Sequence, residues 1–307
     1  MAKQEKVLNF MGLGKAALAV SALLLLISIG SLATQGLKLG LDFTGGSLVE
    51  VGYQQDADLG KIRQTLTDAG YQDVVVQNFG APTDVLIRLG ETHDPKLGDN
   101  VLAALQDTET QQLELRRNEY VGAQVGEELR EQGGLGMLLA LFMIMVYIAF
   151  RFQFKFSIGS VAALAHDVII TLGFFSVFGI EFDLTVLAAV LAVIGYSLND
   201  TIVVFDRIRE NFRIVRKGEP VEIVNLSLTQ TLSRTLMTSL TTLLVVLALA
   251  IFGGEIIHGF AVALLVGIVV GTYSSIYVAA NIMLMLGVSR DDLIPPPKED
   301  EAVDEMP

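Results

Sequence analysis

Ionisable side chains inside long apolar runs are the residues of this sequence best suited to chemistry. Asp200, with Asn199 beside it, lies near the end of the apolar run 184–205, and Arg234 opens the next run, 235–252. An ionised carboxylate in hydrocarbon costs at least about 2.5–3.5 kcal/mol on insertion scales, and such groups typically face a bundle interior and serve ion or proton pathways. The pattern therefore indicates a charge-handling site that contains Asp200 and Arg234.

Asp200 and Arg234 are expected at a similar depth in the membrane. At 1.5 Å per residue, Asp200 lies about 24 Å along a helix from Leu184, toward one side of a core about 30 Å thick. Arg234 starts the following span from that same side. Lost hydration favours a protonated carboxylate, whereas a nearby guanidinium favours the ionised form, so a small movement can switch the proton. The alternative is a static buried ion pair that only fixes helix packing.

Three further polar residues are weaker candidates. Asn199 can line the same path or hydrogen-bond across helices, and the two interpretations carry equal weight. His166 and Asp167 lie about midway along the run 156–178, where adjacent ionisable residues are costly. Hydrogen-bonded packing or an inner-leaflet cavity is the favoured interpretation for this pair, and a proton relay that includes Asp167 is the alternative.

Other kinds of site are not expected. The chain has no cysteine, and its three histidines (93, 166 and 258) lack the spacing of metal ligands. No paired catalytic aspartates, Ser-His dyad or zinc motif is placed to act, so we expect no enzyme, cofactor or metal. The net charge of -13 argues against nucleic acid as a partner.

The elements that must position these residues are transmembrane helices. The chain has 307 residues, 52% of them hydrophobic, and a mean hydropathy of +0.55. Several runs approach the length of about 20 residues that crosses a bilayer. Six spans are predicted, near 16–33, 135–150, 156–178, 184–205, 235–252 and 260–286. A cleaved signal peptide is the alternative for the first run, because small residues at 31–33 resemble a cleavage site.

The distribution of basic residues predicts the orientation. Lysines and arginines follow the second, fourth and sixth spans, whereas the short loops 179–183 and 253–258 contain none. Because basic loops stay in the cytoplasm, both termini are expected inside. The predicted parts are a cytoplasmic N-terminus (1–15), a first helix (16–36), an extracytoplasmic domain (37–132), a five-helix bundle (133–290) with a cytoplasmic basic loop and amphipathic segment at about 207–233, and a disordered acidic tail (291–307).

The extracytoplasmic domain has an α/β pattern. Strands are expected near 47–53, 73–79, 85–89 and 113–115, with helices near 59–69 and 95–105. Asp56 is placed to cap the first helix and Asp94 the second. The order β-α-β-β-α-β is that of a ferredoxin-like unit.

Two glycine-containing segments are assigned structural roles. The segment 40–46 contains Asp42, Phe43, Gly45 and Gly46, and its adjacent glycines predict a tight turn with positive φ. A phosphate-binding loop is not expected, because neither Lys-Ser nor a helix follows. Gly267 and Gly271 form a small-xxx-small site for helix contact, within the bundle or with a partner.

Five motifs occur in a characteristic order along the chain. They are GLDFTGG (40–46), VGAQVGEEL (121–129), AHDV (165–168), GYSLNDTIVVFDRIREN (195–211) and TLSRTL (231–236). Together they closely resemble the SecF family of the bacterial Sec protein-export apparatus, within the resistance-nodulation-division superfamily of proton-driven transporters. The resemblance covers the whole chain apart from the tail, and the motif at 195–211 is its most specific part.

The resemblance implies a function, partners and a location. It implies a subunit that works with SecD, the SecYEG channel and YajC in the bacterial inner membrane and uses the proton-motive force to promote preprotein export. It also implies that Asp200 and Arg234 occupy the positions of the family's essential transmembrane carboxylate and arginine. A small-molecule exporter and a structural assembly factor without a proton role are the alternatives, and a scaffold is expected to tolerate an isosteric amide at position 200.

Overall fold

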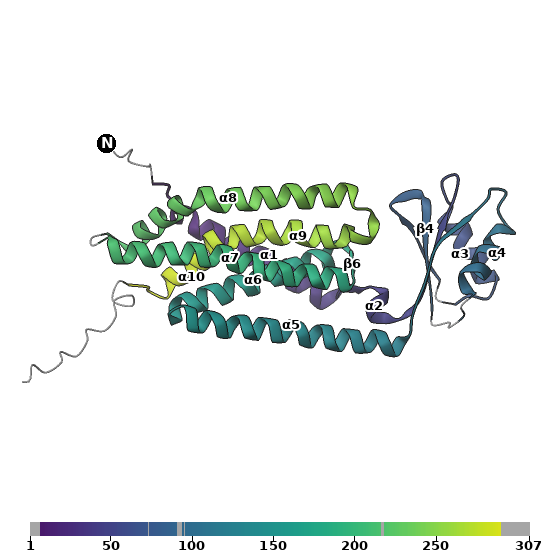
Figure 1. Ribbon diagram of the computed structural model, residues 1–307, viewed down its shortest axis with the longest axis horizontal. Helices are drawn as coiled ribbons and strands as arrows, with labels where there is room; N and C mark the ends of the chain where they lie inside the picture. The colour runs from purple at the N-terminus through teal and green to yellow at the C-terminus, as the bar shows by residue number, and fades with distance from the viewer. Residues whose placement is uncertain (1–6, 73, 91–93, 95, 216–217, 290–307) are drawn as a thin grey trace, which may run out of the picture.

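The computed structural model describes residues 7–289 except 73, 91–93, 95 and 216–217. Among the described residues, six helical segments are long and apolar enough to cross a membrane. Five are the helices α1 (Gly14–Thr34), α5 (Ala123–Arg151), α6 (Phe154–Phe178), α7 (Leu184–Ile214) and α8 (Pro220–Phe252). The sixth joins α9 (Glu255–Ser274), a π-helical turn (Ser275–Ala279) and α10 (Ala280–Met285). The helices run side by side, with a separate α/β domain at one end (Figure 1).

The α/β domain contains one four-stranded sheet. Its elements are β2 (Gly46–Gly52), α3 (Leu59–Asp68), β3 (Val75–Phe79), β4 (Ala81–Leu89), α4 (Leu97–Gln106) and β5 (Glu114–Val121). The strand order is β3-β4-β2-β5, and each pair is antiparallel. Both helices cover the sheet face that points away from the bundle (Figure 1). Alternate strand residues such as Val49 and Val51 meet Ile62 and Leu66 there, and all four are at most 1% exposed.

Both predicted helix caps were wrong. Asp94 precedes the N-cap of α4, which is Lys96, although its carboxylate accepts a hydrogen bond from the backbone N–H of Lys96. Asp58, not Asp56, caps α3, since its carboxylate accepts hydrogen bonds from the backbone N–H groups of Gly60 and Lys61. Asp56 and Asp58 are both of a residue type that is preferred at N-caps, and the residue at which the helix begins decides which of them is the cap.

The glycine-rich segment makes a close junction between the domain and the bundle. Gly45 and Gly46 have φ values of 68° and 120°, which confirms the tight turn. A Cβ added at Gly45 would lie 2.6 Å from the Cα of Ala123, the first residue of α5. The turn is preceded by the short helix α2 (Leu41–Thr44), whose Phe43 stacks on Phe182 at 6.0 Å between ring centroids. Glycine is therefore needed here for close backbone approach as well as for φ.

The loop between the fourth and fifth spans is shorter than predicted. The prediction of a basic loop and a separate amphipathic segment at 207–233 was wrong. Residues 207–214 continue α7, and residues 220–233 belong to α8. Pro220 and a capping box between Glu219 and Glu222 start α8 well before its apolar part. The tail 291–307 and the N-terminal residues 1–6 lie outside the described residues.

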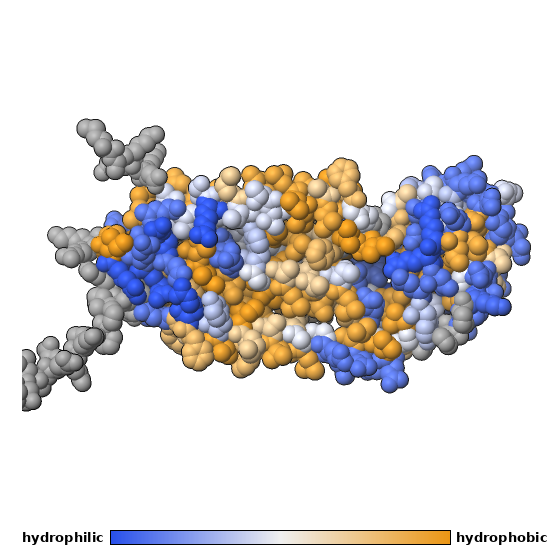
Figure 2. Space-filling model, in the orientation of Figure 1, coloured by the Kyte–Doolittle hydropathy of each residue, from blue (hydrophilic) through white to orange (hydrophobic). Residues whose placement is uncertain are grey.

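Packing within the bundle brings α7 and α9 close together. Gly267 lies against the side chain of Val193, and Gly271 lies against Ser197. The small-xxx-small site is thus used inside this chain. Apolar residues cover the middle of the bundle surface, and hydrophilic residues gather at its far end and over the α/β domain (Figure 2).

Candidate functional site

Asp200 lies where three helical segments meet inside the bundle. It projects from α7 and is 6% exposed. Thr235 of α8 donates to its Oδ1 at 2.7 Å, and Ser275, the first residue of the π-helical turn, donates to its Oδ2. Both carboxylate oxygens are therefore bonded by neutral hydroxyl groups from neighbouring helices.

Arg234 does not pair directly with Asp200. Its side chain is exposed, and it makes no ion pair with Asp200 within 4.0 Å, although the two groups are close enough to interact electrostatically. Arg234 instead lines a cavity of about 370 Å³ between α7 and α8, which also includes Asp206 and Glu210. The static contact ion pair considered from the sequence is not formed here.

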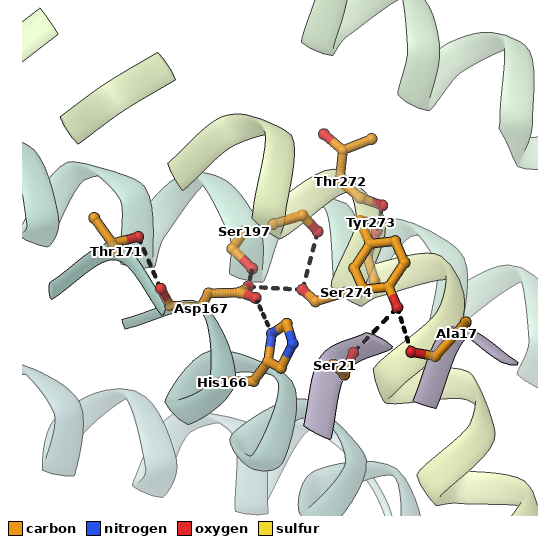
Figure 3. Close-up of polar contacts among 11 residues, drawn as sticks. Ala17, Ser21, His166, Asp167, Thr171, Ser197, Thr272, Tyr273 and Ser274 are labelled. Carbon is orange, nitrogen blue, oxygen red and sulfur yellow. Dashed lines mark hydrogen bonds and ion pairs between the residues drawn. The ribbon is translucent and has the colours of Figure 1, made fainter. Parts of the chain in front are cut away.

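Asp167 of α6 forms a second and more enclosed polar cluster. It is 0% exposed, and its Oδ1 lies 2.8 Å from His166 Nδ1. Ser197 of α7 and Ser274 of α9 both donate to its Oδ2, the latter at 2.7 Å. Figure 3 shows these side chains converging on the carboxylate from three helices. His166 donates to Asp167 in the forms of the imidazole that carry a proton on Nδ1.

The cluster extends from His166 toward α1. The His166 ring stacks on Tyr273 at 6.3 Å between centroids. The Tyr273 hydroxyl donates to the backbone carbonyl of Ala17 at 2.6 Å and lies 3.1 Å from Ser21 Oγ (Figure 3). His166 Nε2 is buried and has no hydrogen-bond partner among the described residues.

Two consecutive serines connect the carboxylates. Ser274 bonds Asp167 and Ser275 bonds Asp200. Both serines lie where α9 passes into the π-helical turn, a feature that is frequent at functional sites. On the opposite side of the site, Ser197 and Asp200 are three residues apart on α7 and so lie on one face. A shift at this part of α9 would alter the bonds of both carboxylates together.

Asn199 is not part of this network. Its side chain is exposed and makes no hydrogen bond with the described residues. Because consecutive helical residues differ by about 100° around the axis, burial of Asp200 turns Asn199 outward. The structure therefore brings Asp200 and Asp167 close to one serine pair, while Arg234 and Asn199 lie on exposed faces.

Sequence reasoning did not identify the hydroxyl partners individually. The partners are Ser197, Thr235, Ser274 and Ser275. Ser274 and Ser275 could have been found from the sequence, because they are adjacent polar residues inside the apolar run 260–286. No group of three or more His, Cys, Asp or Glu side chains in the described part of the chain is arranged to hold a metal ion.

Comparisons with known proteins agree with the motifs. The family described as protein export membrane protein SecD/SecF, C-terminal, matches residues 100–289, and the SecD/SecF GG motif matches residues 30–57. The protein translocase subunit SecF of Pseudomonas aeruginosa is 55% identical over 98% of this chain and 98% of that protein. The SecF subunits of Vibrio alginolyticus and Escherichia coli O157:H7 are 53% and 46% identical over 99% and 98% of this chain, and over 98% and 94% of their own lengths.

Two solved structures are also similar. A crystal structure of SecDF, a translocon-associated membrane protein from Thermus thermophilus, is 37% identical and has a TM-score of 0.84. A second SecDF structure, in a super-membrane-facing form, is 37% identical and has a TM-score of 0.70. Each comparison covers 93% of this chain and 39% of the solved chain, so this chain spans well under half of the SecDF chains.

Proposed function

This chain belongs to the SecF family of protein translocase subunits, and from that membership we propose that it joins a SecD partner to use the proton-motive force for preprotein export. In this proposal it acts with the SecYEG channel and YajC in the bacterial inner membrane, with both termini in the cytoplasm. The α/β domain is then extracytoplasmic, and its element order supports a ferredoxin-like class. The chain is a transport subunit and performs no covalent chemistry.

The observation that carries the proposal is the hydrogen bonding of Asp200. When ionised, Asp200 accepts from the hydroxyls of Thr235 and Ser275. A protonated carboxyl has one O–H that must donate, so one of the two hydroxyls has to turn away or become an acceptor. Binding a proton therefore changes the hydrogen bonding of α7 to α8 or to the π-helical turn, and we propose that the helices separate where a hydroxyl turns away. This converts a charge change into a change in helix packing.

The membrane potential can supply the energy for such a change. Moving one elementary charge through 100 mV is worth about 2.3 kcal/mol, which biases a two-state equilibrium more than tenfold. In this proposal Arg234 acts through its charge at the edge of the α7–α8 cavity and tunes the proton affinity of Asp200 from there. Asp167 mainly holds α6, α7 and α9 in place around it.

The junction offers a route from the bundle to the domain. Asp42 of the glycine-rich segment accepts a hydrogen bond of 3.0 Å from the backbone N–H of Leu184, the first residue of α7. The strand β1 (Lys38–Leu39) also pairs with β6 (Glu181–Phe182), which directly precedes α7. The different TM-scores of the two SecDF structures, at equal identity and coverage, indicate that SecDF takes more than one shape over this region. We infer that displacement of α7 moves the domain.

The test is preprotein export in membrane vesicles with and without a proton gradient. Wild type, Asp200→Asn and Asp167→Asn are compared at matched levels of this protein and of SecD. We expect Asp200→Asn to lose the gradient-dependent part of export while the gradient-independent part remains. Full gradient-dependent export by Asp200→Asn, with the complex assembled, would overturn the proton role and favour a scaffold.

A further inference from the structure

A cluster of arginines lies at the end of the bundle remote from the α/β domain. Arg151, Arg209 and Arg213 line a pocket of about 370 Å³ together with Asp206 and Glu210. The same end of the molecule is strongly hydrophilic next to the apolar belt (Figure 2).

Two of the arginines are held in fixed positions. The guanidinium carbons of Arg151 and Arg209 lie 5.3 and 5.5 Å from the centre of the Phe152 ring. Asp206 accepts from both, at 2.7 Å from Arg151 and 3.3 Å from Arg209. Phe152 is only 5% exposed, so the arginines are attached to a rigid part of the bundle. The pocket is thus organised before any ligand arrives.

Positive charge in the pocket exceeds the available negative charge. Arg209 and Arg213 are four residues apart on α7, and Arg209 shares Asp206 with Arg151, so three positive charges lie close together. Asp206 is shared, whereas Glu210 pairs with Arg207 at 2.9 Å. Arg213 makes no ion pair with any described residue, and the buried Nε of Arg209 has no hydrogen-bond partner among them. An anion that accepts several N–H bonds would pair with Arg213 and with the accessible N–H groups of Arg209.

The surroundings of the pocket identify the source of that anion. α7 has 31 residues and is about 46 Å long, so about 15 Å of it extends beyond a hydrocarbon core of about 30 Å. Arg209 and Arg213 lie in the last two turns of α7, and Arg151 is the last residue of α5. Apolar side chains lie beside it, since Ile214 of the pocket is 65% exposed and Phe150, next to Arg151, is 89% exposed. A phosphate group attached to acyl chains matches both features, whereas a free phosphate matches only the charge.

We propose that Arg151, Arg209 and Arg213 bind the headgroup phosphate of an anionic phospholipid at the membrane interface. The three arginines surround the phosphate, Asp206 and the Phe152 ring hold Arg151 and Arg209 in place, and Phe150 and Ile214 lie along the acyl chains. This site is independent of the proton role proposed for Asp200.

The test measures lipid binding to the full-length protein in detergent by native mass spectrometry. Wild type is titrated with phosphatidylglycerol and with phosphatidylcholine, and the measurement is repeated with Arg209→Gln/Arg213→Gln. Each basic group near an anionic lipid surface contributes roughly fivefold in binding, so the double variant is expected to bind phosphatidylglycerol at least about tenfold more weakly. The matched control is Arg207→Gln, which removes one positive charge from the same helix. Arg207 pairs with Glu210 and lines the cavity between α7 and α8 that contains Arg234, not the proposed lipid site.

Each outcome decides for or against the site. Selective phosphatidylglycerol binding that is lost in the double variant and kept in Arg207→Gln supports it. Equal binding of both lipids, or an equal loss in Arg207→Gln, would reduce the effect to general surface charge and overturn it. Displacement of the lipid by millimolar inorganic phosphate would assign the pocket to a free anion. If the double variant does not fold, Arg213→Gln alone carries the test, because Arg213 is exposed and unpaired among the described residues.

Discussion

Asp167 and Asp200 lie in the same bundle and bond to adjacent serines, but their environments differ. Asp167 is 0% exposed and receives hydrogen bonds from one imidazole and two hydroxyls. Asp200 is 6% exposed and receives two hydroxyl hydrogen bonds. Asp167 has an adjacent imidazole among its hydrogen-bond partners, whereas the partners of Asp200 among the described residues are hydroxyl groups alone. The difference teaches that the more deeply buried of the two carboxylates is not the one that we propose as the coupling group.

The largest expected effect separates the two carboxylates in export. Asp200→Asn removes the exchangeable proton and is expected to abolish gradient-dependent export. Asp167→Asn keeps the shape and most hydrogen bonds of its site and is expected to retain more than about half of that export. Export assays in energised vesicles measure both. Equal losses in the two variants would break the comparison and make Asp167 part of the proton path.

Stability is expected to show the opposite order. Asp167→Ala leaves the buried His166 and Ser197 without their partner, while Ser274 keeps its bond to the backbone carbonyl of Gly271 at 3.1 Å, and it is expected to lower the free energy of unfolding by about 3 kcal/mol. Asp200→Ala frees two hydroxyls, and Ser275 already bonds the backbone carbonyl of Thr272 at 3.0 Å, so a loss of about 1 kcal/mol is expected. Denaturant titration in detergent measures both values. A larger loss for Asp200→Ala would contradict the assignment of Asp167 as the structural group.

The two serines sharpen the comparison further. Ser275→Ala removes a bond to Asp200 and is expected to reduce gradient-dependent export about fivefold, which corresponds to a hydrogen bond of about 1 kcal/mol. Ser274→Ala is expected to lower stability by a similar free energy while export is kept. The control is Ser160→Ala on α6, whose hydroxyl is buried and unbonded among the described residues. Identical effects of Ser274→Ala and Ser275→Ala on export would show that the serines act as one unit.

Arg234 tests whether charge or contact matters at Asp200. Because no contact ion pair is formed, Arg234→Lys is expected to keep most gradient-dependent export, and Arg234→Gln to lose much of it. The comparison uses export at matched protein levels. Failure of the lysine variant would indicate that the guanidinium forms a two-point contact with a carboxylate during the cycle.

The smallest effect is expected at Asn199. Its exposed side chain makes no hydrogen bond with described residues, so Asn199→Ala should change the free energy of unfolding by less than about 0.5 kcal/mol. The same denaturant titration measures this. A large loss of stability would place Asn199 inside the Asp200 network, whereas lost export with normal stability would assign it to contact with a partner.

The sequence by itself determined the elements and the candidates. Six apolar runs, the β-α-β-β-α-β order and the glycine turn depend on local composition and period, which act within one segment. Asp200 and Asp167 could be identified as candidate site residues because an ionised group in hydrocarbon is energetically costly, which makes such groups rare in apolar runs.

Only the tertiary structure decided which side chains meet. Thr235, not Arg234, reaches Asp200, although the two are neighbours in sequence. One residue turns a helix by about 100°, and one turn advances it by about 5.4 Å, so small differences in rotation and register between helices exchange one neighbour for another. Ser274 and Ser275, which lie where α9 passes into the π-helical turn, also bond to different carboxylates from α6 and α7. Packing among helices far apart in the chain sets these quantities, and no local pattern encodes them.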